Sequence, residues 1–397
     1  MSRGFRRANA ALFLAGLITF ATLYTYQPLF PSLVDAFGIS PTVASLALSV
    51  TTLALALTLP VAGSLSDALG RRAMMSVAVL VAPALVMAST APLPFAGLLA
   101  LRLVQGVVLA GVPGVAMAYL ADEAPPRYLP AAMGLYIAGN AVGGMTGRIV
   151  TAWLADPLGW RPAVLIIGAA SLLMGVAFVL LLPPSRGFRR RPLHLWTLTV
   201  SLLGHLRHPG LLALYSLAFA AMGAFVTLYN YVSFRLLGPG FGLSQAQVAL
   251  IFLAYAGGAV GSTVMGGLVD RFGRGRVMTT ALLLMAGGAA LTLPVSLPAV
   301  AVGIAVFTTG FFGVHTLASS GVGPLAGGAR AQASSLYLFC YYLGSSVSGT
   351  GGGLVYERWA WPGVVALVLA LVVAAAGAAW LAATVAARRA GAPEGAV

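Results

Sequence analysis

Long apolar runs, separated by short polar segments, follow one another along the whole chain. About 20 apolar residues let an α-helix cross the hydrocarbon core of a bilayer. The chain holds twelve runs of this kind, six before and six after a basic stretch at 184–208. They span 8–34, 43–66, 73–91, 94–120, 131–155, 161–183, 209–236, 244–269, 277–297, 299–322, 331–356 and 361–386. Runs this long indicate helices rather than the short alternating strands of a membrane barrel.

Composition places the chain in the membrane. Of its 397 residues 60% are hydrophobic and only 8% are charged, whereas soluble domains carry about 25% charged residues. A surface of this size cannot be covered with so few charges, so lipid must surround most of it. The single cysteine, Cys340, excludes an internal disulfide and is expected to be a small packing residue.

The N-terminal segment resembles a signal peptide at first sight, with arginines before an apolar run. The run continues through Pro28 to Val34, which is too long for a signal-peptide core, and no clear cleavage site interrupts it. We therefore interpret it as the first transmembrane helix.

The arginines predict the orientation. The net charge is +14, and all 22 basic residues are arginine. With the N-terminus inside, 17 of the 22 fall on cytoplasmic segments, as the positive-inside rule requires. Both termini and the connector at 184–208 are predicted to be cytoplasmic. The excess of positive charge is thus explained by the orientation of the chain in the membrane, and no nucleic-acid partner is expected.

The connector mixes apolar residues such as Trp196 with arginine and histidine. This composition predicts a short helix lying along the membrane surface. A plain tether between halves and a regulatory or lipid-binding role both remain open.

A repeat relates the two halves. GSLSDALGRR at 63–72 returns as GGLVDRFGRGR at 266–276, each between the second and third helix of its half. AGNAVGGMTG in the fifth helix is echoed by LGSSVSGTGG in the eleventh at nearly the same offset. Internal repeats of this length indicate two bundles related by a pseudo-twofold axis along the membrane normal.

These stretches resemble the major facilitator superfamily. G-x-L-x-D-x-x-G-R-R between helices two and three is similar to the signature loop of that family, and LRLVQGVVLAG in helix four, with Arg102, Gln105 and Gly106, is similar to its second motif. The glycine-rich fifth helix resembles a motif of the drug/proton antiporter branch. Longer stretches resemble bacterial inner-membrane efflux proteins. One departure is that Gly275 stands where the first loop has Arg72.

The resemblance implies an all-α polytopic membrane protein with twelve transmembrane helices in two pseudo-symmetric six-helix bundles. The first bundle would span 1–183 and the second 209–390, joined by the connector at 184–208. It further implies a carrier that works by alternating access, with the substrate cavity between helices one, four, seven and ten.

The repeated loops are expected to control conformation. Asp67 lies where the second helix ends, and its carboxylate can be stabilised by the N-terminus of a neighbouring helix. The resemblance implies that this neighbour is helix eleven, which begins near Ala331. Arg71, one turn on, can reach Asp122, and by the repeat Asp270 should face helix five near Ala131. Such latches would form when the inside is closed. The alternative is a loop that only fixes topology. The expected gating residues are Gly63, Asp67, Gly70, Arg71, Asp122, Asp270, Gly273 and Arg274.

Arg102, Asp35 and His315 are the candidates for proton coupling. Arg102 lies within an apolar run, and a charge there needs a partner, which could be a carboxylate, helix-end carbonyls or a substrate anion. Asp35 is the nearest plausible carboxylate along the chain. The resemblance implies that Arg102 takes part in proton coupling, and the alternative is a structural pairing with Asp35 or with backbone carbonyls. His315 is the one mid-helix group that titrates near neutral pH. No acid lies in the middle of any predicted helix, which favours neutral, zwitterionic or anionic substrates over strictly cationic ones.

Aromatic and polar side chains supply the predicted cavity, which would suit amphipathic ligands. For Tyr231, an aromatic belt at the interface is an equal alternative. Arg148 and Arg235 are expected to extend to the interface. The predicted cavity residues are Tyr24, Tyr26, Gln27, Gln105, Tyr229, Asn230, His315 and Tyr341.

Glycines that recur every four residues give the fifth helix one face without side chains. Gly139, Gly143 and Gly147 share that face, and small residues let helices approach closely. The resemblance implies packing against helix eight, where Gly257 and Gly261 form a matching face. Ordinary tight packing is the alternative.

We predict a secondary transporter of the bacterial inner membrane that exports small amphipathic compounds in exchange for protons. An importer or exporter of a sugar, amino acid or organic anion, or a facilitator without proton coupling, remains the alternative. An enzyme is not indicated, because no metal-ligand cluster, carboxylate pair or phosphate-binding loop occurs. The expected partners are a small-molecule substrate, protons and the lipid bilayer. We expect no cofactor, and a monomer is the default.

Overall fold

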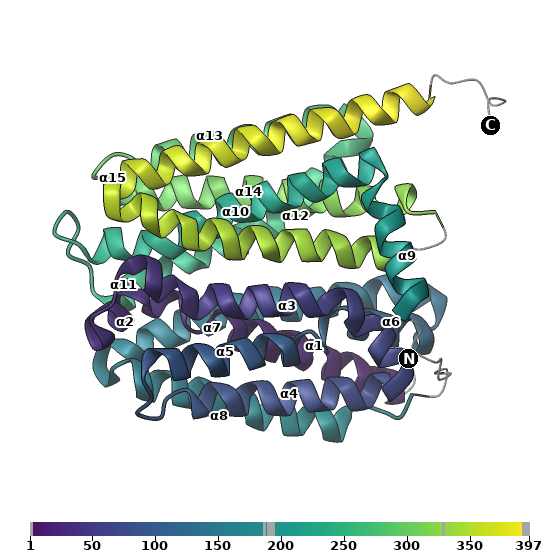
Figure 1. Ribbon diagram of the computed structural model, residues 1–397, viewed down its shortest axis with the longest axis horizontal. Coiled ribbons are helices and arrows are strands. Elements are labelled where there is room, and N and C mark those ends of the chain that lie inside the picture. The colour runs from purple at the N-terminus through teal and green to yellow at the C-terminus, as the bar shows by residue number, and fades with distance from the viewer. Residues whose placement is uncertain (1–2, 186–187, 189–194, 328–329, 391–397) are drawn as a thin grey trace. The chain divides into compact units, whose positions relative to one another are not determined.

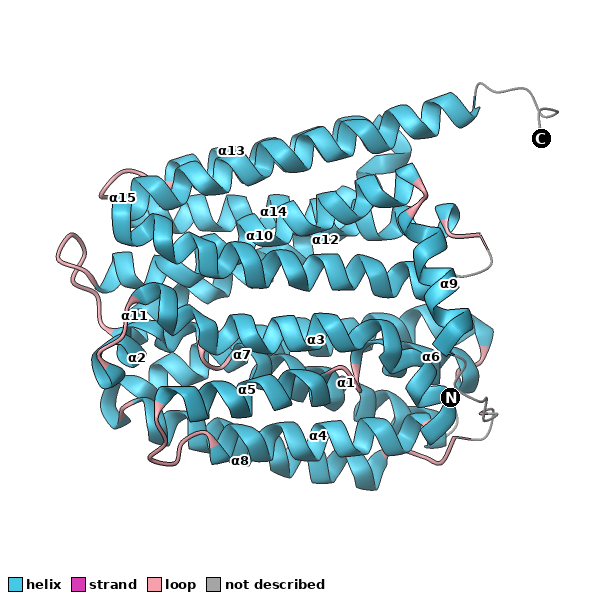
Figure 2. Cartoon of the chain, viewed as in Figure 1, coloured by secondary structure: helices cyan, strands magenta, loops and turns pink. Residues whose placement is uncertain are grey.

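The computed structural model describes residues 3–185, 188, 195–327 and 330–390. Within these ranges the chain is almost entirely helical and contains no strand (Figure 2). Long helices run side by side, linked by short turns (Figure 1). This agrees with the prediction that every apolar run is a helix.

The first six predicted spans are all present as helices, two of them broken. The first span comprises α1, a 3₁₀ turn η1, and α2, and the fourth comprises α5 and α6. Their bounds are α1 Arg3–Tyr24, η1 Gln27–Leu29, α2 Phe30–Phe37, α3 Pro41–Leu69, α4 Arg71–Ala88, α5 Phe95–Leu109, α6 Pro113–Glu123, η2 Pro126–Tyr128, α7 Leu129–Leu158 and α8 Trp160–Leu181.

The last six predicted spans follow a connector helix, and the eighth is broken near its start. Their bounds are α9 Leu195–Leu206, α10 Pro209–Leu237, α11 Gln245–Ala249, η3 Leu250–Leu253, α12 Ala254–Phe272, α13 Arg274–Leu291, α14 Leu297–Leu325 and α15 Arg330–Ala390. The connector does form a helix, as expected, although part of it lies outside the described residues. That α9 lies along a membrane surface stays a prediction.

The last two predicted spans are joined in α15, which has 61 residues. Ala360 interrupts it with φ 49° and ψ −149°, a conformation that alanine rarely adopts. The next residue, Trp361, donates its indole N–H to the Thr292 carbonyl at 3.1 Å. This bond and the tight turn fold the chain back, so α15 supplies helices eleven and twelve.

Twelve transmembrane helices result. In the described residues, nine helical stretches are long and apolar enough to cross a membrane, and α15 counts among them once. Splitting α15 at Ala360 gives ten. The remaining two are α7 and α13, with 30 and 18 residues.

The distribution of polar and apolar side chains is that of a protein in lipid. Large apolar side chains lie on the outside, among them Leu173, Leu180 and Trp380. Arg102 and Arg148 are among the largest fully buried side chains. Because such an arrangement would be unstable in water, the chain is a multi-pass membrane protein.

Glycine makes the repeated turn possible in both halves. Gly70 ends α3 with φ 105° and Gly273 ends α12 with φ 81°. A side chain would be strained at both positions. The two turns therefore share one backbone conformation, as the repeat predicts.

Contacts divide the chain into two compact units. Unit 1 comprises Met1–His194, Tyr229–Leu253 and Thr350–Glu357, and unit 2 comprises the rest. Unit 1 thus includes the end of α10, the start of the eighth span and one stretch of α15. The sequence-based boundaries 1–183, 184–208 and 209–390 stay a prediction.

Candidate functional site

The break after α1 creates acceptors for a buried cation in unit 1. α1 ends at Tyr24, and a 3₁₀ turn follows from Gln27; Pro28 has no N–H to offer the Tyr24 carbonyl. Because the helix ends there, the carbonyls of its last turn, including Thr22 and Leu23, have no intrahelical partner and carry the negative end of the helix dipole. Arg102 Nη1 donates to Thr22 O at 3.1 Å, and Arg102 Nη2 donates to Leu23 O at 2.7 Å.

Further groups complete the surroundings of Arg102. Its Nε donates to the Ala47 carbonyl of α3 at 2.8 Å, and its Nη1 to Gln105 Oε1 at 2.5 Å. The guanidinium carbon also lies 4.9 Å from the centre of the Tyr26 ring. The charge is thus held by carbonyls, one amide and an aromatic face, which together stabilise a fully buried cation.

Asp35 is not among the partners of Arg102 in the described part of the chain. Its side chain is exposed in α2, and both ion pairs found there involve Arg71. Of the three kinds of partner expected for Arg102, the structure shows backbone carbonyls. A transport role for Asp35 stays a prediction.

Arg148 of α7 is buried, which corrects the expectation that it extends to the interface. It donates to Gln27 Oε1 at 2.5 Å and to Gly144 O at 2.6 Å. Its guanidinium carbon lies 3.7 Å from the centre of the Tyr24 ring. The physical reason is the broken end of the first span, which places an amide and an aromatic face beside the arginine.

Gln27 connects this cluster to the second half of the sequence. Its amide nitrogen donates to Asn230 Oδ1 at 2.7 Å, and both residues belong to unit 1. The repeat offset is 203 residues, since Gly63 corresponds to Gly266, and the same offset relates Gln27 to Asn230. Equivalent residues contact each other where they meet a twofold axis. Tyr229, beside Asn230, stacks on Phe252 with ring centres 5.7 Å apart.

Two acids in unit 1 bind the N-termini of helices. Both contacts lie at the end of the helices that is opposite to the Gly70 turn. Glu357 Oε1 accepts from Thr42 N at 2.9 Å and from Thr42 Oγ1 at 2.6 Å. Asp156 Oδ1 accepts from Gln245 N at 3.1 Å. Thr42 and Gln245 are again related by the offset of 203, and each lies in the first turn of its helix, where free N–H groups favour an anion. In the orientation predicted from the arginines these two contacts lie on the outer side, and we refer to them as the outer latches.

The sequence reasoning missed the outer latches. Asp156 and Glu357 were passed over because they lie at helix ends, where charges are common. A usable signal was present: they are two of only eight acids, and they follow corresponding helices of the two halves.

The Gly70 turn holds an ion-pair network. Arg71 Nε lies 2.9 Å from Asp122 Oδ2, the contact expected from the sequence, and Arg71 Nη2 lies 3.3 Å from Asp67 Oδ1. Gly63 lies in the last turns of α3, where a Cβ would meet open space, so its predicted gating role stays a prediction. The predicted contacts of Asp67 and Asp270 with helix N-termini of the opposite half stay predictions.

In unit 2, Arg274 is bound differently. Its Nη1 donates to the Leu317 carbonyl at 2.9 Å and its Nη2 to Ser320 Oγ at 3.1 Å. Asp270 is exposed. The second turn therefore keeps its arginine on α14 without an acid within ion-pair distance in the described residues.

His315 lies in an aromatic cluster of unit 2. Tyr337 OH is 3.0 Å from His315 Nδ1, and the Tyr341 ring centre is 4.8 Å from that of the imidazole. Phe311 stacks on the imidazole at 6.1 Å. The cluster lines a narrow crevice against α10, so His315 and Tyr341 lie together; that they line a substrate cavity stays a prediction.

The glycine faces pack within their own units. A Cβ at Gly139, Gly143 or Gly147 would collide with the α1 backbone at Phe13, Leu17 or Ala21. A Cβ at Gly257 or Gly261 would instead meet Thr309 of α14. Both faces allow close helix approach, but the partners differ from the expected pairing of helices five and eight.

No group of three or more metal-binding side chains occurs in the part of the chain that the structure describes. The groups described above are hydrogen-bond donors, amides and aromatic rings, which are able to bind and orient a polar ligand.

Comparison with known proteins gives consistent matches. The sequence profile of the Major Facilitator Superfamily matches residues 12–238 and again 230–396. The chain is 46% identical over 364 residues to the uncharacterized MFS-type transporter YybF of Bacillus subtilis (strain 168), covering 92% of this chain and 90% of YybF. It is 43% identical to the inner membrane transport protein YnfM of Escherichia coli (strain K12), covering 92% and 87%.

Among solved structures, the chain resembles a bacterial homolog of the human lysosomal transporter Spinster in an inward-facing, unoccupied conformation. The TM-score is 0.78 at 17% identity, and the match covers 97% of this chain and 98% of the other. At that identity the likeness concerns the fold alone.

Proposed function

Because the chain belongs to the Major Facilitator Superfamily and is a secondary transporter rather than an enzyme, we propose that it exports small amphipathic compounds in exchange for protons. The site of action would be the bacterial inner membrane, with both termini in the cytoplasm. The arginine distribution and the resemblance to the drug/proton antiporter branch support this proposal.

The observation that carries the mechanism is the pair of outer latches. Glu357 and Asp156 bind the N-termini of helices that are equivalent in the repeat. Gln27 donates to Asn230, and these two residues are related by the same offset of 203. A carrier that alternates needs contacts that form in one state and break in the other. Each latch is a carboxylate at a helix N-terminus and contributes about 0.3–1 kcal/mol. Contacts of this strength favour one conformation but are weak enough to break in every transport cycle.

The inner latches complete the cycle in this proposal. Asp67 would bind the N-terminus of α15 and Asp270 that of α7 when the cytoplasmic side closes. Asp67 and Asp270 would then hold the cytoplasmic side closed in one state, and Asp156 and Glu357 would hold the outer side closed in the other. Gly70 and Gly273 supply the tight turns that place two of these acids.

Arg102 would couple substrate to the cycle. It fixes the broken end of α1 through Thr22 and Leu23, so a change in its bonds would move the first span. In the described helices the acids lie toward helix ends rather than mid-span. A fixed buried cation, with His315 as a second polar group, supports neutral, zwitterionic or anionic compounds.

The test is transport by purified protein in liposomes with an imposed pH gradient. The proposal predicts movement of an amphipathic compound against its own gradient, with opposite proton flow, that stops when the pH gradient is collapsed. Saturable movement that ignores the pH gradient would identify a facilitator instead. Uptake of a small metabolite in the direction of proton flow would identify an importer.

A further inference from the structure

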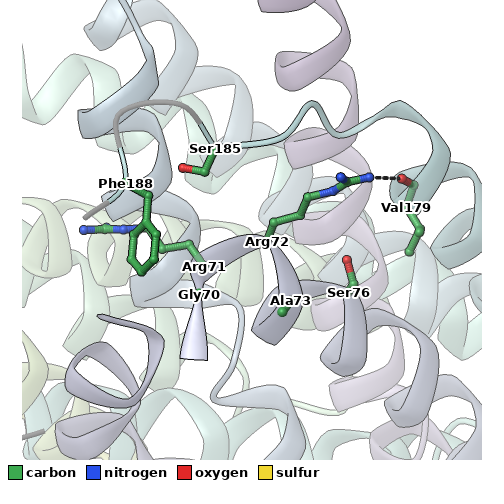
Figure 3. A pocket seen from close by; sticks show the side chains of 8 residues that line it. All are labelled: Gly70, Arg71, Arg72, Ala73, Ser76, Val179, Ser185 and Phe188. Carbon is green, nitrogen blue, oxygen red and sulfur yellow. Dashed lines mark hydrogen bonds between the residues drawn. The ribbon is translucent and has the colours of Figure 1, made fainter. Parts of the chain in front are cut away.

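A cavity of about 380 Å³ lies beside the Gly70 turn in unit 1. The start of α4 and the end of α8 form its walls, with the residues just after α8 above (Figure 3). Its lining residues are Gly70, Arg71, Arg72, Ala73, Ser76, Val179, Ser185 and Phe188. None of the transport steps proposed above uses this space.

The cavity is rich in hydrogen-bond donors. The first turn of α4 has no side-chain cap and no acidic residue, so its N–H groups are available to an anion. Arg72 donates to the Val179 carbonyl at 3.2 Å, and its remaining guanidinium N–H groups make no other described hydrogen bond. The Ser76 hydroxyl also faces the cavity without a described partner (Figure 3).

The charges around the cavity are unevenly placed: the three arginines Arg7, Arg71 and Arg72 are matched in number by Asp67, Asp122 and Glu123, but none of these acids pairs with Arg72. Asp67 and Asp122 neutralise Arg71, but no acid lies within ion-pair distance of Arg72 in the described residues. Arg7 adds a second cation nearby, because its Nη2 donates to the Leu180 carbonyl at 2.8 Å. One acid lies at the rim: Glu123 accepts from Ser185 Oγ at 2.8 Å, which leaves Arg72 and the α4 N-terminus as the positive centre.

Apolar surface continues from the cavity along both helices. Val77 of α4 is 57% exposed and Leu180 of α8 is 71% exposed, and Val81 and Val176 extend the same surface. Surfaces of this kind face acyl chains in a membrane protein. The cavity itself lies where α4 begins and α8 ends, and the ends of transmembrane helices are where a chain meets lipid headgroups.

We propose that this cavity binds the phosphate group of an anionic phospholipid. The phosphate oxygens would accept hydrogen bonds from the α4 N-terminus, Arg72 and Ser76, while the acyl chains lie along α4 and α8. A free phosphate ion shares the headgroup chemistry but gains nothing from the apolar surface, so the lipid is the ligand that fits both parts.

The second turn offers a matched comparison. At the repeat offset, Gly275 replaces Arg72, and Thr279 replaces Ser76. The Thr279 hydroxyl already donates to the Gly275 carbonyl at 3.1 Å. The second turn therefore has the same backbone but lacks the cation and the available hydroxyl, and lipid binding is proposed for the first turn alone.

Native mass spectrometry of the full-length protein tests the proposal. Detergent-solubilised protein is mixed with equal amounts of dioleoyl phosphatidylglycerol and dioleoyl phosphatidylcholine. The wild type should retain the anionic lipid preferentially, and Arg72→Gln should reduce that preference about 5-fold, the effect of one basic residue near an anionic surface. Arg276→Gln, an exposed arginine after the second turn, should leave it unchanged.

Two further measurements keep the test decisive. If Arg72→Gln fails to fold, Ser76→Ala should still lower the preference, by about 2-fold for one hydrogen bond. Equal loss with Arg72→Gln and Arg276→Gln would overturn the proposal, since it would indicate general charge attraction. Displacement of the bound lipid by millimolar inorganic phosphate would overturn the lipid as ligand and identify a free-phosphate site. The readout is binding, so it stands apart from any result on transport.

Discussion

The two copies of the repeat share their backbone but differ in their buried charge. The first copy buries Arg102 and Arg148, whereas the equivalent positions of the second copy hold Ala305 and, by the match of AGNAVGGMTG with LGSSVSGTGG, Gly353. The second copy instead places His315 among aromatic rings. A bundle that buries fixed cations at a broken helix is suited to hold ligand and helix together, while its neutral counterpart can rearrange at low electrostatic cost.

The repeated turns show the same division. Arg71 lies between two acids, but Arg274 binds a carbonyl and a serine hydroxyl. Glycine fixes the turn in both copies, so the backbone is set by the repeat and the chemistry by the residues around it. The comparison assigns charge-dependent behaviour mainly to the first copy.

Removing Arg102 should have the largest effect. Arg102→Ala leaves buried carbonyls at Thr22 and Leu23 unpaired, at a cost of about 3 kcal/mol. If that cost falls on the transport cycle, the rate drops about 100-fold. Liposome transport, with thermal unfolding measured in parallel, separates lost coupling from lost folding.

Arg102→Lys is the matched control. Lysine keeps the charge but lacks the planar fork that reaches Ala47, Thr22 and Leu23 together. Transport should remain far below that of the wild type. Full activity in Arg102→Lys would mean that charge alone matters and that the fixed helix end is irrelevant.

The second-largest effect should come from the acids of the two repeated turns, and its size should differ between them. Asp67→Asn removes the ion pair with Arg71 as well as the proposed inner latch, so transport should fall about 10-fold. Asp270→Asn removes only a proposed latch and should cost about 3-fold. If both variants lost the same fraction of transport activity at equal protein levels in the membrane, the proposed difference between the two copies of the repeat would be wrong.

The outer latches should behave as a symmetric pair. Asp156→Asn and Glu357→Gln each remove one carboxylate from a helix N-terminus, which should shift the population about 2- to 5-fold toward an open outer side. The readout is labelling of Ser32→Cys by a membrane-impermeant maleimide in a Cys340→Ser background. Arg276→Gln, which alters an exposed charge after the second turn, is the control and should label at the wild-type rate.

The aromatic cluster of the second copy should give the smallest effect. Tyr337→Phe removes the hydrogen bond to His315 Nδ1 and should change the transport rate about 2-fold. If the loss matched that of Arg102→Ala, the second copy would carry the essential polar group, and the comparison would be reversed.

Much of the fold could be predicted because its signals are local. Apolar runs fixed all twelve helices, and the glycine-bounded repeat located both turns. The Arg71–Asp122 contact was also predictable, because the turn and the end of the fourth helix were already placed by the family resemblance.

The surroundings of the buried arginines could not be predicted in the same way. Hydropathy shows that Arg102 is buried, but not that a break near Pro28 exposes the Thr22 and Leu23 carbonyls to it. Arg148 seemed close enough to a helix end to reach water. The partners of Gly139 and its neighbours depend on how helices pack, which small-residue spacing alone does not determine.

Cross-linking the outer side tests the central claim most directly. Ser32 Oγ lies 3.1 Å from Gln245 Oε1, so cysteines at these two positions, in a Cys340→Ser background, can be joined by a short reducible cross-linker. If the outer side must open during each cycle, the joined protein loses transport by at least about 10-fold, and reduction restores it. Transport at the same rate before and after cross-linking would contradict the account.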